Sequence, residues 1–166
     1  MGYGVKTSPW NGRRVLTWYL KEGTVPTNFP RALDIWAAGV GISFERVLVE
    51  NAPVDFKVKP DKSYPQWSPS MKMMLLKLDS SLGVTLHEIG HLLGLSHEHD
   101  RPDRRVAFYA TDPRGLGGAV LRENNLRIYG NAPDEDSVMM YPETRYAGAT
   151  TPSAGDLRTV REINGW

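Results

Sequence analysis

Residues 87–97 read His-Glu-Ile-Gly-His-Leu-Leu-Gly-Leu-Ser-His, a stretch that predicts both a local structure and a chemistry. On a helix, residues four apart share a face, so His87 and His91 can present ring nitrogens to one metal ion. Glu88 follows His87 directly and can project beside the ion, where a carboxylate can act as a base on a bound water. We therefore expect a helix that carries two metal ligands and a general base.

The third histidine requires this helix to end. His97 follows His91 by about 1.7 helical turns, so a continuous helix would carry it away from the ion. Glycine adopts positive φ at little cost, so a bend at Gly94 can return His97 to the site. The five fixed residues of this pattern are expected by chance in about one chain of this length in 10^5. His99, the fourth histidine of the chain, lies off the pattern, and we expect it to face solvent or to support a ligand.

The donor set indicates the metal and the reaction. Three neutral imidazoles with an open fourth position are typical of catalytic zinc, although other first-row ions bind the same donors. Zinc lowers the pKa of a bound water to about 7, and Glu88 can take its proton and pass it to a leaving amine. This favours a zinc-dependent endopeptidase. Two alternatives stay open: a zinc amidase acting on cell-wall peptides, and a catalytically silent zinc-binding interaction domain.

The composition is that of an ordinary globular protein. The chain has 166 residues, 40% of them hydrophobic and 23% charged, which fits one domain with its own core. The formal net charge is +1 and no apolar run is long enough for a membrane span, so we expect neither nucleic acid nor membrane as a partner. There is no cysteine, hence no disulfide. The absence of cysteine suits a bacterial or viral protein. We expect a monomer that acts on protein or peptide and is secreted after removal of a leader or pro-segment.

Hydrophobic patterning predicts the order of the elements. Strands are expected at 14–20, 42–49, 54–59 and 71–78, helices at 28–40 and 80–93, and a last helix after a capping-box sequence at 153–156. Residues 60–70 contain three prolines and are expected to form a loop, and 100–136 to form loops with at most one short helix. We predict a single α+β domain over 1–166, with a mixed sheet backed by two helices (about 1–94) and a loop-rich lower half ending in a helix (about 95–166).

Three segments of the chain resemble one known group of enzymes. Residues 87–97 resemble the zinc signature of the metzincin metallopeptidases. Starting at His97, residues 97–104 (HEHDRPDR) resemble the H-E-x-x-R-x-D-R pattern of astacins, and residues 137–141 (SVMMY) resemble the astacin Met-turn, S-x-M-x-Y. The chain is therefore similar to the astacins, and this implies a metzincin-like catalytic domain with a twisted sheet.

The resemblance also implies roles for three further residues. Met139 would lie beneath the three imidazoles as an apolar floor. Tyr141 would be a switchable fifth zinc ligand that moves away to hydrogen-bond the oxyanion. Glu98 would reach the buried N-terminus of the matured chain or water near it. An ordinary core methionine and a packing tyrosine are the alternatives for Met139 and Tyr141.

Part of the pattern also resembles the matrix metalloproteinases. Met140-Tyr141-Pro142 matches their M-Y-P sequence, which would make Met140 the methionine of the turn, and Trp18–Val47 is similar to them in places. In those enzymes the turn follows the third histidine closely, whereas 42 positions separate His97 from Met139 here. This spacing favours the astacin alignment.

The chain departs from astacins in three respects, which bear on specificity. It lacks their cysteines, Leu95 stands where they usually have an aromatic residue, and Asp134-Glu135-Asp136 replaces a segment that contains tyrosine. The resemblance implies a cleft in which an extended peptide adds to an edge strand within residues 60–78. The pocket for the side chain after the cut bond would form behind His87 from residues that follow Tyr141, and Arg145 there would favour acidic side chains.

Overall fold

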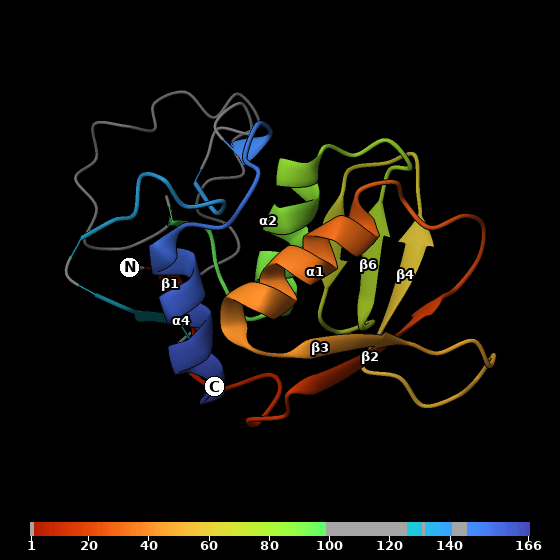
Figure 1. The fold of residues 1–166 in the computed structure, drawn as a ribbon, viewed down its shortest axis with the longest axis horizontal. Coiled ribbons are helices and arrows are strands. Elements are labelled where there is room, and N and C mark those ends of the chain that lie inside the picture. Colours follow the sequence, from red (N-terminus) through yellow and green to blue (C-terminus); the bar gives the residue numbers. More distant parts are fainter. Residues whose placement is uncertain (1, 99–125, 131, 141–145) are drawn as a thin grey trace.

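The computed structural model describes residues 2–98, 126–130, 132–140 and 146–166 (Figure 1). Within them no helix is long and apolar enough to cross a membrane. The loops predicted over 100–136 lie mostly outside these residues. The described elements, in chain order, are β1 (Tyr3–Val5), β2 (Val15–Leu20), α1 (Phe29–Val40), β3 (Ser43–Arg46), β4 (Phe56–Pro60), β5 (Gln66–Ser68), β6 (Met73–Leu76), α2 (Leu82–Leu92), β7 (Leu126–Ile128) and α4 (Ala154–Asn164).

Five of the strands form the predicted mixed sheet, in the order β3-β2-β4-β6-β5. β2 pairs in parallel with β3 and β4, and β4 pairs in parallel with β6. β5 runs antiparallel to β6 and forms one edge of the sheet. Phe56 and Val58 on β4 are fully buried, which confirms the predicted alternation on that strand.

Helices α1 and α2 lie side by side and pack against the sheet (Figure 1). α1 buries Leu33, Trp36 and Val40 along one stripe, as their spacing predicts, and ends at Gly41 in the left-handed conformation. α2 begins after Ser81, whose hydroxyl accepts a hydrogen bond from the Val84 amide. The indole N–H of Trp36 donates to the Leu86 carbonyl over 3.0 Å, so the helix that carries the histidine motif is fixed to its neighbour.

Two strand predictions need correction. Residues 60–70 do not form a loop throughout, because Gln66–Ser68 is strand β5. The prolines flank these three residues instead of interrupting them, and an edge strand tolerates proline nearby. The strand predicted over 42–49 ends at Arg46, and Leu48 and Val49 beyond it are 77% and 67% exposed.

The short strands β1 and β7, which pair antiparallel, were not predicted because three residues carry too little periodicity.

The C-terminal helix α4 contacts both the N-terminal segment of the chain and the end of α2. The predicted capping box is present: the Ser153 hydroxyl accepts from the Asp156 amide, and the Asp156 carboxylate accepts from the Ser153 amide. The Asn164 amide donates to the Leu93 carbonyl over 2.9 Å, and the Gly2 amide donates to the Thr159 hydroxyl over 2.8 Å. α4 therefore supports the segment where α2 ends.

Candidate active site

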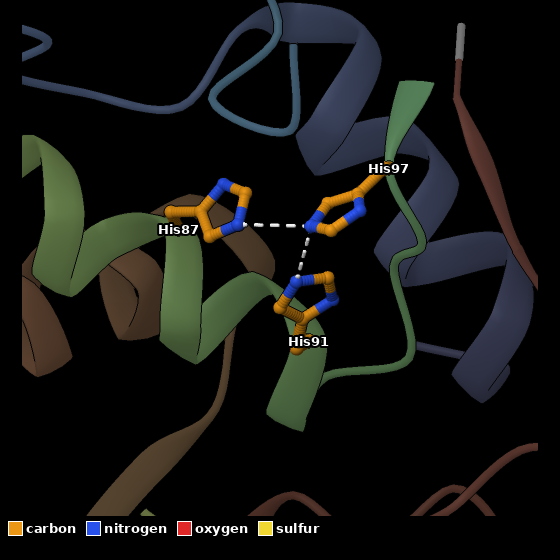
Figure 2. A group of neighbouring side chains, drawn as sticks. All are labelled: His87, His91 and His97. Carbon is orange, nitrogen blue, oxygen red and sulfur yellow. Dashed lines mark hydrogen bonds between the residues drawn. The ribbon is translucent and has the colours of Figure 1, made fainter. Parts of the chain in front are cut away.

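The imidazole rings of His87, His91 and His97 converge at the C-terminal end of α2 (Figure 2). The Nε2 atoms of His91 and His97 are 3.0 Å apart, and those of His97 and His87 are 3.3 Å apart. His87 is buried, whereas the other two rings are partly exposed. The three ring nitrogens predicted to share one ion are thus brought together.

The predicted bend at Gly94 brings His97 back to the helix. Gly94 has a φ of 103°, and the Leu95 amide returns to donate to the Gly90 carbonyl over 2.9 Å. Strand β1 holds this turn from the other side, because the Val5 amide donates to the Gly94 carbonyl and the Tyr3 carbonyl accepts from the Ser96 amide. His97 therefore approaches the other two rings from a separate segment, as Figure 2 shows.

The second nitrogen of two rings is held by backbone carbonyls. His87 Nδ1 lies 2.7 Å from the Val138 carbonyl oxygen, and His91 Nδ1 lies 2.9 Å from the Leu95 carbonyl oxygen. A carbonyl only accepts hydrogen bonds, so in both rings the proton resides on Nδ1. Neutral rings in this tautomer present the Nε2 lone pair as an acceptor, which is the form that binds a metal.

The arrangement fits a tetrahedral zinc ion. Zinc–nitrogen bonds of about 2.0 to 2.1 Å place neighbouring ligand nitrogens roughly 3.3 to 3.4 Å apart in a tetrahedron. The two Nε2 separations of 3.0 and 3.3 Å are close to this edge length. The Nε2 atoms of His87 and His91 are both acceptors and both lie close to His97 Nε2, so one cation could be shared by the three rings.

Met139 and Glu98 lie where two distant segments meet beside α2. Met139 is 1% exposed, and its sulfur is 2.6 Å from the position that a Cβ on Gly90 would occupy. Its carbonyl accepts from the Glu98 amide over 3.0 Å. The Glu98 carboxylate, also 1% exposed, accepts from the Asp134 amide over 2.9 Å. Met140 is buried as well, so burial alone does not distinguish the two methionines.

The other predicted site residues are placed as follows. Glu88 lies on α2 next to His87 and is 6% exposed. Tyr141, His99 and Arg145 lie outside the described residues. The role of Glu98 toward the N-terminus of the matured chain stays a prediction.

Sequence reasoning missed Tyr146. Its ring stacks on that of His87, with centroids 4.2 Å apart and planes at 13°. Tyr146 also lines a pocket of about 330 Å³, together with Glu135, Asp136, Ser137 and Ala149. A tyrosine five residues beyond the Met-turn gives no periodic signal, so only the spatial arrangement identifies it.

Comparison with known families decides the class of the protein. Residues 68–161, more than half of the chain, match the family model described as Astacin, a peptidase family. The chain belongs to the astacin family. It is accordingly a zinc metalloendopeptidase of the metzincin type, with zinc as its cofactor and proteins or peptides as its substrates.

Individual relatives agree with this assignment. The chain is 35% identical over 102 residues to Astacin-like metalloprotease toxin 4 of Loxosceles laeta, covering 55% of this chain and 88% of that protein. It is 36% identical over 87 residues to Zinc metalloproteinase nas-38 of Caenorhabditis elegans, covering 49% of this chain and 12% of that one. The solved structure of myroilysin superposes with a TM-score of 0.66 at 19% identity, over 99% of each chain, and supports the fold.

Proposed function

We propose that His87, His91 and His97 hold the catalytic zinc through Nε2, and that Glu88 is the general base for hydrolysis of a peptide bond. The observation that carries this proposal is the convergence of the three Nε2 atoms, at 3.0 and 3.3 Å, in rings of which two direct Nδ1 at backbone carbonyls. Zinc bound there would polarise a substrate carbonyl and acidify water.

Glu88 would move the proton that the reaction transfers. As the water oxygen bonds to the carbonyl carbon, Glu88 accepts a water proton, and when the carbon–nitrogen bond breaks, it delivers that proton to the leaving amine. Its buried position on α2, directly after His87, supports this role. Tyr141 remains the predicted hydrogen-bond donor to the oxyanion, and Met139 the predicted floor of the site.

The substrate would bind as an extended strand along β5. β5 is the edge of the sheet on the side of β6, it runs antiparallel to its neighbour, and it contacts α2. An edge strand offers unpaired backbone groups to a peptide that adds to the sheet. This choice narrows the predicted edge within residues 60–78 to Gln66–Ser68 and assigns Met73–Leu76 to the sheet interior.

We further propose an extracellular, monomeric enzyme without nucleic-acid or membrane partners. The balanced net charge of +1 supports the lack of a nucleic-acid partner. A relative named as a toxin and a structural neighbour named as a hatching enzyme support action outside the cell. We also retain the predicted division into an upper part (about 1–94) and a lower part (about 95–166), with the substrate cleft between them.

The test compares wild type with Glu88→Ala and with Glu50→Ala, a control at an exposed loop position. Each protein is assayed for zinc content and for digestion of casein and of a cell-wall preparation. We expect one zinc in all three and a loss of casein cleavage of about 10^2-fold or more in Glu88→Ala only. Equal cleavage by wild type and Glu88→Ala would refute the general base. Digestion of the cell-wall preparation but not of casein would favour the zinc amidase. If neither substrate is digested, a catalytically silent zinc-binding domain is favoured.

A further inference from the structure

A buried carboxylate lies behind the Met-turn, away from the three histidine rings. Asp156 is 1% exposed and accepts three hydrogen bonds. Its Oδ1 accepts from the Ser137 hydroxyl over 2.5 Å, and its Oδ2 accepts from the amides of Val138 and Ser153, each over 3.0 Å. The Ser153 bond belongs to the capping box of α4, whereas the other two attach the helix to the Met-turn.

These bonds continue to His87 without a gap. The Ser137 oxygen, whose proton points to Asp156, accepts from the Met139 amide over 3.0 Å. That amide shares its peptide group with the Val138 carbonyl, and the carbonyl accepts from His87 Nδ1 over 2.7 Å. The direction is the same at every step: imidazole to peptide, peptide to hydroxyl, hydroxyl to carboxylate. Hydrogen bonds aligned in this way polarise one another, and a charged acceptor at the end strengthens them.

The hydrogen bonds that Asp156 accepts favour its ionised form. All three neighbouring groups donate hydrogen bonds to it. A proton on either carboxylate oxygen would therefore point at another donor hydrogen. Burial and the charge of Asp134 together raise the pKa of Asp156 above its ordinary value, although the three hydrogen bonds lower it in part. A helix cap alone requires the bond from the Ser153 amide, but it requires neither Ser137 nor Val138.

We propose that Asp156 is a positioning residue for His87, which fixes the Nδ1–H tautomer and the ring orientation through the relay of Ser137 and the Val138–Met139 peptide. The inference rests on the proposed function, in which His87 Nε2 binds zinc. Electron density that the relay shifts toward the Val138 carbonyl makes it a better acceptor for the imidazole N–H, and this strengthens Nε2 as a ligand.

Three variants of the full chain separate the relay from the cap. In Asp156→Asn, an amide oxygen in place of Oδ2 keeps the bonds from Val138 and Ser153, but the amide nitrogen faces the Ser137 hydroxyl and cannot accept its proton. Ser137→Ala removes the hydroxyl step and leaves Asp156 in place. Ser153→Ala, the matched control, weakens the cap of α4 and leaves the relay intact.

The measurements are the zinc dissociation constant, by competition with a chromophoric chelator, and the Tm of the zinc-free protein. We expect the dissociation constant to rise about tenfold in Asp156→Asn and in Ser137→Ala. Ser153→Ala should bind zinc within about twofold of wild type while its Tm falls by about 3 °C. The NMR signal of the His87 Nδ1 proton should be present in wild type and Ser153→Ala and weakened in the relay variants.

The proposal is overturned if Asp156→Asn and Ser137→Ala bind zinc as tightly as Ser153→Ala does. If Asp156→Asn fails to fold, the comparison of Ser137→Ala with Ser153→Ala decides alone by the same criterion. A wild type that binds no zinc, or that binds it equally well after His87→Ala, would instead refute the proposed function. The two failures are therefore distinguishable.

Discussion

A Cβ atom on Gly83 would overlap the carbonyl oxygen of Tyr146, so the first turn of α2 touches the backbone of a segment 63 positions away. Tyr146 in turn stacks on His87 at 4.2 Å. The absence of a side chain at position 83 thus allows the segment that backs a proposed zinc ligand to approach the helix.

Gly83→Ala is expected to destabilise the protein severely. The obstacle is backbone, which cannot rotate away as a side chain can, so the loss of unfolding free energy should be at least about 2 to 3 kcal/mol. Gly148→Ala is the matched control, because a Cβ there meets nothing within 4 Å. Urea unfolding should show the control within about 0.5 kcal/mol of wild type. Equal stability of the two variants would contradict the contact.

Gly94→Ala should weaken zinc binding as well as stability. Its φ of 103° is unfavourable for alanine, and a Cβ would press on Val5 and Ile163 at 3.1 and 3.2 Å. Gly165, with a φ of 69° and open space around it, provides a control with a similar backbone penalty of roughly 1 to 2 kcal/mol. We expect both variants to lose stability and only Gly94→Ala to lose zinc affinity. Unchanged zinc titration of Gly94→Ala would show that the bend does not position His97.

Asp55 should make the stability of the sheet depend on acid pH. Burial raises its pKa, but the bonds from the Thr17 amide and hydroxyl and from the Arg13 guanidinium outweigh it and hold the pKa below 3.8. A lowered pKa in the folded state stabilises the fold above the ordinary pKa, and this contribution is lost as pH falls through the folded value. At neutral pH the free energy of unfolding of wild type, measured by urea denaturation, should exceed that of Asp55→Asn by about 1 kcal/mol. The difference should vanish in strong acid, and one that persists there would contradict this assignment.

The two carboxylates that line the pocket beside Tyr146 should influence cleavage preference. Glu135 and Asp136 border this pocket, and a negative charge disfavours acidic side chains that enter it. In a peptide-library digest, the double variant Glu135→Gln/Asp136→Asn should raise cleavage before acidic residues, relative to basic ones, by roughly fivefold. The double variant Glu45→Gln/Glu50→Gln, at two exposed positions, is the control. An unaltered ratio would show that the side chain after the cut bond does not enter this pocket.

Local patterns were sufficient to predict most of the fold. The stripe Leu33, Trp36 and Val40 and the alternation Phe56 and Val58 report burial directly, because each follows the period of its element. The edge strand β5 could not be predicted, since its pairing with β6 arises from tertiary contacts and not from its own three residues.

The candidate site also combines features that local sequence predicts with features that depend on tertiary contacts. The spacing of His87, His91 and His97 predicts their convergence, because helix geometry and one glycine bend fix it locally. The supports of the site are not local. Tyr146 and Asp156 reach His87 through packing and through backbone groups of the Met-turn, and a backbone carbonyl leaves no mark in the sequence.

The most direct test of the account is the X-ray absorption spectrum of the zinc-loaded wild-type protein beside that of His97→Ala. We predict three imidazole nitrogens at about 2.0 to 2.1 Å from zinc in wild type and two in the variant. A spectrum that fits fewer than three imidazoles in wild type, or that does not change in His97→Ala, would contradict the claim that these three rings hold one ion.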